Sequence, residues 1–327
     1  MARMQEKIFS VNVPATSANL GPGFDCFGLA LQLYNNFIFR VCNDKPGHVS
    51  FQANFPLRQG PHTNLVYKAY SHALRYLNIE KVPGLDIYAI SNIPSARGLG
   101  SSASAVVAGV LAAGAVCGEN LRFSEVIEIA TYIEGHPDNV APAVLGGMTV
   151  SISEGGSVYS HKLDWPDEFR VLVGIPEIKV KTHAARKVLP RRVSFEDAVF
   201  NVGRAALFIA SLTKNDPRGL ALSMDDQLHQ RARASLIPGF SKILNKSYDV
   251  GALGCVISGS GPCILCVVEK DNRRALNAVP EIMQKTWRNF EIASCVEELE
   301  VQKNPTRIQE IPFEEFQTTV KSFGWSL

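Results

Sequence analysis

The stretch Pro94-Ser-Ala-Arg-Gly-Leu-Gly-Ser-Ser-Ala-Ser104 decides the fold, because it joins a short apolar strand to a long apolar helix through two glycines. The strand is expected at residues 85–90 and the helix at residues 101–117, where alanine, valine, leucine and glycine predominate. Gly98 and Gly100 allow positive φ and a close approach of the backbone to a ligand. The free N–H groups and the dipole at the start of the helix favour an anion. The stretch therefore predicts a cradle for a phosphate group.

Three other interpretations of this stretch compete with the phosphate cradle. A Walker A loop needs Gly-Lys-Ser or Gly-Lys-Thr, and residues 94–104 contain no lysine. A dinucleotide fingerprint needs a third glycine, where Ala103 stands, and a following strand that ends in an acid. Glu119 lies at a suitable distance, but it follows one predicted helix and precedes another. The third alternative is a turn that only packs the helix against the strand.

Two more glycine-rich stretches lie at the ends of predicted strands. The first is Pro14-Ala-Thr-Ser-Ala-Asn-Leu-Gly-Pro-Gly-Phe-Asp25, which contains Asn19 and Asp25 among turn residues. The second is Gly251-Ala-Leu-Gly-Cys-Val-Ile-Ser-Gly-Ser-Gly-Pro262. Polar loops at strand ends commonly contact ligands. Taken alone, Asn19 and Asp25 are more often turn residues than ligand contacts, and the second stretch is equally consistent with a tight turn.

Apolar periodicity outlines the rest of the chain. Strands are expected at residues 8–13, 29–42, 148–152, 170–175, 255–257 and 264–268, and helices at 64–77, 124–134, 195–212, 220–228 and 276–287. Ser124 is the expected cap of its helix. Residues 154–168 are polar and turn-rich, so a domain boundary is placed there. Strands and helices alternate without a strict βαβ rhythm, which indicates the α+β class.

Length and charge exclude several kinds of protein. The 327 residues suffice for two domains with substantial cores. The 33 basic and 31 acidic residues give a net charge of +2, which argues against a nucleic-acid-binding surface. The N-terminus has no signal-peptide pattern, and no apolar run reaches the roughly 18 residues of a membrane helix. The sequence therefore predicts a cytoplasmic protein that binds neither nucleic acid nor membrane.

The seven cysteines predict reduced core residues. Cys263 and Cys266 form a CxxC inside an apolar strand. Residues three apart on a strand point to opposite faces, so a shared metal ion is not expected.

The three glycine-rich stretches together, in this order, resemble the GHMP kinases, a family named for galactokinase, homoserine kinase, mevalonate kinase and phosphomevalonate kinase. The resemblance covers roughly residues 8–268. It implies a two-domain fold, with an N-terminal α/β domain like that of ribosomal proteins at residues 1–165 and a ferredoxin-like C-terminal domain at residues 166–327. It also implies ATP as a cofactor, bound by the whole of Pro94, Ser95, Ala96, Arg97, Gly98, Leu99, Gly100, Ser101, Ser102, Ala103 and Ser104.

Two further segments are similar to those of the members that phosphorylate homoserine. They are Glu134-Gly-His-Pro-Asp-Asn-Val-Ala-Pro142 and Lys181-Thr-His-Ala-Ala-Arg-Lys-Val-Leu-Pro190. The resemblance implies phosphorylation of the L-homoserine hydroxyl to O-phospho-L-homoserine, in threonine biosynthesis, by a homodimer. Its implied substrate-binding residues are Asn19, Asp25, His136, Asn139, Thr182, Arg186 and Arg233. Many members have Pro-Tyr-Arg at residues 231–233, so Arg231 is an alternative to Arg233.

The chemistry of homoserine is consistent with these residue types. A planar arginine fork matches its carboxylate, and carboxylate or amide oxygens match its ammonium group. Two alternatives stay open, a different small alcohol as the substrate and a nucleotide-binding relative without activity.

ATP carries about four negative charges, and bridging Mg²⁺ is the usual counter-charge in phosphoryl transfer. The resemblance implies Ser102 and Glu134 as metal ligands, with Glu128 as the alternative to Glu134. In several relatives an aspartate acts as the base where Asn139 stands here. Asn139, Asp138 and Arg186 are therefore expected to position the transition state, and Asp138 or Asp25 is the alternative proton acceptor.

Overall fold

The computed structural model describes residues 7–56, 60, 63–80 and 82–326, and it contains two β-sheets. The first sheet has seven strands in the order β11-β1-β2-β4-β3, and β5 pairs with both β2 and β6. The second has four strands in the order β10-β7-β9-β8. The strands are β1 (Ile8–Ala18), β2 (Phe27–Cys42), β3 (Val49–Ala53), β4 (Gly84–Ser91), β5 (Met148–Glu154), β6 (Ser157–Leu163), β7 (Phe169–Pro176), β8 (Gly254–Ile257), β9 (Ile264–Glu269), β10 (Ser294–Leu299) and β11 (Gln309–Glu310).

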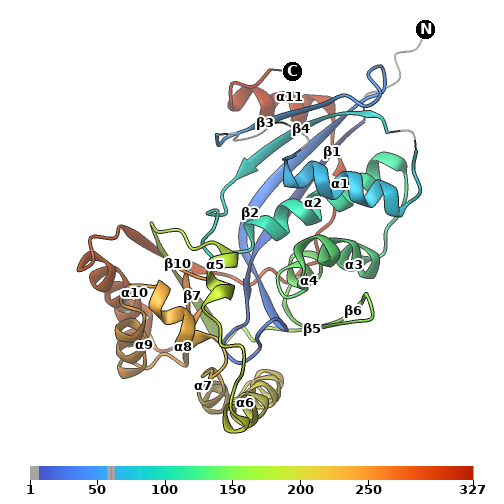
Figure 1. Ribbon diagram of the computed structural model, residues 1–327. Helices are drawn as coiled ribbons and strands as arrows, with labels where there is room; N and C mark the ends of the chain where they lie inside the picture. The colour runs from blue at the N-terminus through green and yellow to red at the C-terminus, as the bar shows by residue number, and fades with distance from the viewer. Residues whose placement is uncertain (1–6, 57–59, 61–62, 81, 327) are drawn as a thin grey trace.

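Four helices pack on one face of the first sheet (Figure 1). They are α1 (Leu65–Tyr76), α2 (Ser101–Cys117), α3 (Phe123–Glu134) and α4 (Val140–Leu145). Helix α2 lies at the centre of this layer, where Val106, Val107 and Val110 are fully buried. The small and apolar composition of residues 101–117 therefore follows from burial on most sides, as the sequence predicts.

The second sheet has antiparallel neighbours throughout and follows a β-α-β-β-α-β order, which is the ferredoxin-like arrangement. The helices that connect the strands of this sheet are α5 (Thr182–Lys187), α6 (Phe195–Lys214), α7 (Pro217–Ser223), α8 (Gln230–Arg233), α9 (Phe240–Asp249) and α10 (Arg273–Arg288). Helices α9 and α10 cover one face. The other face shares a core with the first sheet, in which Leu20 and Leu29 pack with Phe208 and Val256.

The predicted division after residue 165 falls between β6 and β7. The end of the chain, expected with the second domain, packs on the first sheet instead. Strand β11 pairs with β1, and helix α11 (Phe313–Ser322) covers the sheet face opposite α1–α4. Phe316 meets the Tyr88 ring edge-on at 5.2 Å, and Trp325 lies 5.8 Å from the same ring. These apolar contacts explain the aromatic residues of the tail.

Three local predictions are wrong. Helix α3 begins at Phe123, because the Glu125 side chain accepts the Arg122 N–H at 2.8 Å, so Ser124 is not the cap. The region at residues 154–168, predicted to be turn-rich, contains strand β6. A turn at Gly155 and Gly156, both at positive φ, joins β5 to β6. Such glycine pairs are typical of hairpin turns. Helix α7 ends at Ser223, well short of residue 228.

The cysteine pair packs as strand alternation predicts. Cys263 belongs to the core shared by the two sheets, and Cys266 belongs to the core under α9 and α10. Within the described residues, no helix combines the length and apolarity needed to cross a membrane.

Candidate active site

The three glycine-rich stretches meet in space and are joined to one another by hydrogen bonds. The N–H of Thr16 donates to the Leu99 carbonyl at 3.1 Å, which joins the first stretch to the 94–104 loop. The Ser258 hydroxyl donates to the Gly98 carbonyl at 2.6 Å, and the Gly259 N–H donates to the Ala18 carbonyl at 3.1 Å. The stretches thus form a single unit between the two sheets.

The contacts between the loops are a second reason why positions 98 and 100 require glycine. A Cβ on Gly98, whose φ is +80°, would lie 2.1 Å from the Ser258 carbonyl oxygen. A Cβ on Gly100, at φ +68°, would lie 1.9 Å from the Thr16 hydroxyl. Real Cβ atoms do not approach so closely, so both positions require glycine for the loops to touch each other as well as to approach a ligand.

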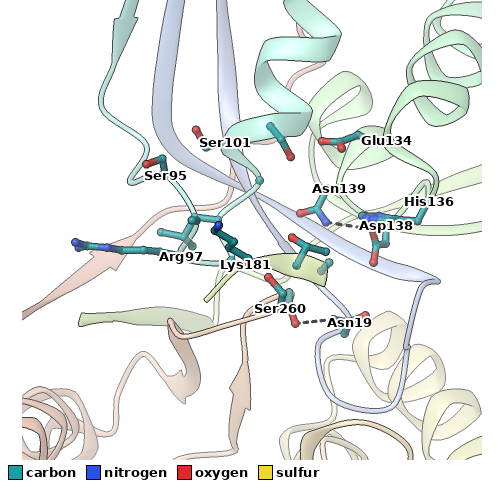
Figure 2. A pocket seen from close by; sticks show the side chains of 18 of the residues that line it. Asn19, Ser95, Arg97, Ser101, Glu134, His136, Asp138, Asn139, Lys181 and Ser260 are labelled. Carbon is teal, nitrogen blue, oxygen red and sulfur yellow. Dashed lines mark hydrogen bonds and ion pairs between the residues drawn. The ribbon is translucent and has the colours of Figure 1, made fainter. Parts of the chain in front are cut away.

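A cavity of about 590 Å³ opens where the loops meet (Figure 2). It is lined by nearly all of the predicted site residues: Asn19, Asp25, residues 94–102, Glu134, His136, Asp138, Asn139, Thr182, Arg186 and Arg233. Arg231 is exposed and lies outside the lining, so of the two alternatives the cavity contains Arg233. In the same way the cavity contains Glu134 and not Glu128.

Two residues expected to contact the cofactor lie outside the lining. Ala103 and Ser104 are fully buried. The Ser104 hydroxyl accepts the Asn35 amide N–H at 2.8 Å and donates to the Ser101 carbonyl at 2.9 Å. Successive side chains point in different directions around a helix. Ser101 and Ser102 face the cavity, so the side chains of the next two residues face the first sheet. They fix the start of α2 instead of lining the cavity.

Helix α2 directs its N-terminus into the cavity. Its N-cap is Gly100, which has no side chain to accept the free N–H groups, and Ser101 and Ser102 line the cavity. Unpaired N–H groups and the positive end of the dipole form a site for an anion. The geometry is therefore consistent with the predicted phosphate cradle.

A cluster of opposite charges lies on the other side of the cavity. Arg186 of α5 makes a bidentate pair with Asp25, with Nη1–Oδ2 at 3.0 Å and Nη2–Oδ1 at 2.7 Å. Arg233 is buried and donates from Nη1 to the Gly259 carbonyl at 2.9 Å. Burial and the neighbouring Arg186 charge lower the pKa of Arg233. Asp25 pairs with Arg186, so this side of the cavity presents a carboxylate and two guanidinium groups next to one another.

Phe24 lies between the two arginines and orients them. Its ring centroid is 5.6 Å from the Arg186 guanidinium carbon and 5.1 Å from that of Arg233. At these distances both guanidinium groups interact with the π-face of the ring. Phe24 stands directly beside Asp25 but is not among the residues predicted from the sequence.

Asn19 fixes the loop that carries Asp25. Its amide nitrogen donates to the Gly259 carbonyl at 2.9 Å, and its oxygen accepts the Asp25 N–H at 3.0 Å. Both residues have positive φ, at 72° and 55°, a conformation that asparagine and aspartate tolerate better than other residues. Asn19 therefore uses both ends of its amide to hold the loop.

A buried polar network supports the same loop from behind. Asp226 accepts the N–H groups of His229 and Gln230 at 2.8 and 2.7 Å. It also accepts the Asn201 amide at 2.9 Å, and the His229 ring lies 2.9 Å from the Gly21 carbonyl. None of these residues was predicted, because the signal that identifies them is spatial and not sequential.

His136, Asp138 and Asn139 form a chain of hydrogen bonds at the start of α4. His136 Nδ1 lies 2.5 Å from Asp138 Oδ1, which also accepts the Asn139 amide at 3.1 Å. Thr16 donates to the Asn139 oxygen at 2.8 Å. Burial lowers the pKa of His136, but the hydrogen bond and charge of Asp138 outweigh burial, so the net pKa is raised above 6.5.

The raised pKa predicts a pH-dependent contribution of His136 to stability. The protonated ring gains its interaction with Asp138 in the folded state, so the stabilisation is complete below pH 6.5 and disappears as pH rises through the raised pKa. His136→Gln should lower the free energy of unfolding by about 1 kcal/mol at acidic pH and by less at alkaline pH. Denaturant titrations of both proteins across this range test the prediction. A difference that grows with pH would contradict it.

Glu134 and Ser102 both line the cavity and have side-chain oxygen atoms that can bind a metal ion. Mg²⁺ binds one or two carboxylates together with substrate phosphates and waters, so this donor set is suitable. No group of three or more acidic, histidine or cysteine side chains suited to a metal ion occurs among the described residues.

The cavity lining also includes residues outside the predicted site. They are Ala18, Leu65, Ala105, Lys181, Gly259 and Ser260. Gly259 and Ser260 belong to the third glycine-rich stretch, which was recognised without assigning its residues. Lys181 precedes Thr182, and the Val180 N–H donates to the Ala96 carbonyl at 3.1 Å, which brings this segment to the 94–104 loop.

Comparison with known proteins agrees with this architecture. The model of the GHMP kinase N-terminal domain matches residues 64–147, and that of the GHMP kinase C-terminal domain matches residues 208–288. A relative from Clostridium beijerinckii is 41% identical over 278 residues, which are 85% of this chain and 92% of the relative. The chain belongs to the GHMP kinase family.

Within that family, several similar proteins are homoserine kinases. The Clostridium beijerinckii relative has this name, as does one from Halothermothrix orenii that is 37% identical over 88% of this chain and 92% of its own. A crystal structure of homoserine kinase from Cytophaga hutchinsonii superposes with a TM-score of 0.84 at 30% identity, covering 94% of this chain and 99% of that one. The mevalonate kinase of L. major shares the fold, with a TM-score of 0.65 at 18% identity, covering 89% of this chain and 95% of that one.

Proposed function

We propose that this protein transfers the γ-phosphoryl group of ATP to the hydroxyl of L-homoserine, giving O-phospho-L-homoserine and ADP in threonine biosynthesis. One observation carries the proposal: a single cavity combines an uncapped helix N-terminus with a paired carboxylate and arginine cluster. The first suits the phosphates of a nucleotide. The second suits a small zwitterion.

The charge cluster complements both charges of an amino acid. The Asp25 carboxylate can accept the substrate ammonium while Arg186 and Arg233 hold its carboxylate, so that opposite charges alternate around the site. The Arg186–Asp25 pair thus orients the amino-acid end and leaves the side-chain hydroxyl free to face the phosphate cradle. Holding the reactants in line is the main contribution that a protein makes to a loose phosphoryl transfer.

Asp138 supports the proposal as a positioning residue. Its Oδ1 is occupied by His136 and by Asn139, and its side chain is 3% exposed. A carboxylate committed in this way holds the Asn139 amide in place. We therefore assign positioning of the reactants to Asp138 and Asn139, without a dedicated base. When bound by Ser102 and Glu134, Mg²⁺ supplies neutralising charge to the phosphates.

The proposal is tested by measuring ADP release with homoserine, mevalonate, shikimate and galactose in parallel. We expect turnover with homoserine at least about 100-fold above the others, because a site built for paired charges discriminates strongly against analogues that lack them. Turnover of another alcohol in place of homoserine would overturn the substrate assignment. ATP binding without transfer to any acceptor would instead identify an inactive relative.

Lys181 is expected to contact the nucleotide phosphates, because the 94–104 loop contains no lysine and Lys181 lines the cavity beside it. Lys181→Met should raise the KM for ATP by about 10- to 100-fold, the range expected for one hydrogen bond between charged groups. The KM for homoserine should change little. Lys179→Met is the matched control, since Lys179 is exposed and lies outside the lining. Equal effects of the two substitutions would contradict the assignment.

A further inference from the structure

Arg233 is held in the cavity wall by two of its three guanidinium nitrogens. Its Nε donates to the Ala185 carbonyl at 3.4 Å and its Nη1 donates to the Gly259 carbonyl at 2.9 Å. Its Nη2 makes no hydrogen bond to any described residue, and this atom is not shut off from solvent. In Arg186, by contrast, both terminal nitrogens are paired with Asp25. Arg233 therefore offers its Nη2 N–H groups to a ligand, and the contacts of its other nitrogens decide where those groups point.

His229 supplies one of these contacts. It is the N-cap of α8, and Arg233 ends that helix four residues later, so the two side chains are neighbours on one face. Arg233 Nη1 lies 3.4 Å from His229 Nδ1. The Phe24 ring lies against both groups, with its centroid 5.2 Å from the imidazole and 5.1 Å from the guanidinium carbon. The position of the guanidinium group thus depends on that of the imidazole.

The contacts of the imidazole define its tautomer. Its Nε2 lies 2.9 Å from the Gly21 carbonyl, which can only accept a hydrogen bond, so Nε2 carries the proton. Arginine can only donate, so Nδ1 must present a lone pair to Arg233. A neutral ring protonated on Nε2 satisfies both contacts at once. A doubly protonated ring would instead direct an N–H group at the N–H group of Arg233.

The surroundings of His229 favour this neutral form. Burial lowers the pKa of the imidazole and outweighs the charge of Asp226, whose Oδ2 lies 3.7 Å from Nε2. The Asp226 carboxylate is already occupied, because it accepts the backbone N–H groups of residues 228–230. Asp226 therefore fixes the turn that carries His229, and the ring keeps the lone pair that Arg233 requires.

We propose that His229 is a positioning residue for substrate binding, whose neutral imidazole holds Arg233 so that Nη2 meets the carboxylate of the amino-acid substrate. His229 is 1% exposed and lies outside the cavity lining, so it acts through Arg233 and not by contact with the substrate. The inference rests on the proposed function, because the carboxylate belongs to homoserine. The competing role is purely structural, in which His229 only supports the loop at Gly21.

Two substitutions of His229 separate these roles. Glutamine places its amide near the Nε2 position, where it can donate to Gly21, but it offers no acceptor to Arg233. Asparagine places its amide near the Nδ1 position, where its oxygen can accept from Arg233, but it does not reach Gly21. His229→Gln should raise the KM for homoserine by about 10-fold or more, the range for one hydrogen bond to a charged group. The kcat and the KM for ATP should change little.

His229→Asn should keep a KM for homoserine close to that of the wild type, even where its Tm is the lower of the two. Steady-state kinetics with each substrate varied, together with Tm, measure the contrast. Phe316→Leu is the control for lost stability, because Phe316 is fully buried under α11 on the sheet face opposite α1–α4. It should lower Tm without changing the KM for homoserine. A KM that follows Tm in all three variants would make His229 structural and overturn the proposal.

The ring nitrogen NMR shifts of His229 test the tautomer without any substrate. In protein labelled at histidine, the resonances that disappear in His229→Gln should show a neutral ring with its proton on Nε2. A proton on Nδ1, or a doubly protonated ring, would overturn the proposal. Absence of homoserine turnover in the wild type would overturn the proposed function and this inference together. Normal turnover with an unchanged KM in His229→Gln would overturn the inference alone.

Discussion

Replacing Gly98 by alanine is expected to lower kcat/KM for both ATP and homoserine by about 100-fold or more, the cost of a displacement of about 1 Å in a positioned site. The added Cβ would lie 2.1 Å from the Ser258 carbonyl oxygen, and φ at this residue is +80°. The obstructing atom belongs to the backbone, so no side-chain rotation relieves the overlap. The loops have to separate, which displaces the cradle from the second domain. Steady-state kinetics with each substrate varied in turn measure the effect.

Gly156→Ala is the matched control for this prediction. Gly156 has φ +88°, and an added Cβ meets no atom of the described chain within 4 Å. It therefore has the same backbone strain without the contact between loops. We expect Gly156→Ala to lower Tm slightly and to leave kcat/KM unchanged. If Gly98→Ala changed activity no more than Gly156→Ala, the contact with Ser258 would not position the site.

The contrast between these two glycines shows what the sequence can predict. The 94–104 motif predicts a phosphate cradle, because its glycines and serines act locally at the start of one helix. The requirement that Gly98 fit against Ser258 involves residues 160 apart in the chain. No local pattern reports such a contact. The resemblance groups the three stretches as one family pattern, and the structure shows that they touch each other.

The secondary structure shows the same contrast between features that local sequence determines and features that depend on distant contacts. Helix α2 and strands β8 and β9 are predicted closely, because continuous apolar runs determine them. Strand β6 is missed because its exposed side chains are polar and its pairing with β5 depends on the hairpin at Gly155 and Gly156. The tail is also placed only by the structure, since β11 has two residues and its partner lies at the opposite end of the sequence.

The candidate site shows a further limit. The charged residues Asp25, Arg186 and Arg233 are identified from their motifs. Their mutual arrangement is not, because Arg186 comes from α5 and reaches Asp25 across 161 residues. The supporting residues Phe24 and Asp226 carry no local signal of function. Sequence therefore supplies the chemical groups, and tertiary packing decides which of them face each other.

Arg186→Met is expected to lower kcat/KM for homoserine by about 1000-fold, which is the loss expected when one partner of a hydrogen-bonded charge pair is removed at a binding site. The fork of Arg186 would hold the substrate carboxylate and orient Asp25 at once. The KM for ATP should change little. Arg186→Lys should recover only part of the activity, because an ammonium group cannot reproduce the bidentate geometry. Initial-rate kinetics with homoserine and ATP varied separately measure both effects.

Arg231→Met is the control, since Arg231 is an exposed arginine on α8 that lies outside the cavity. It should behave as the wild type. The free energy of unfolding separates binding from folding, because the Asp25 and Arg186 side chains are 35% and 37% exposed. A pair so accessible to water stabilises the fold by no more than about 1 kcal/mol. A large loss of stability in Arg186→Met, with normal kinetics in the folded fraction, would make the pair structural. A loss of homoserine turnover at unchanged stability would place Arg186 in contact with the substrate carboxylate.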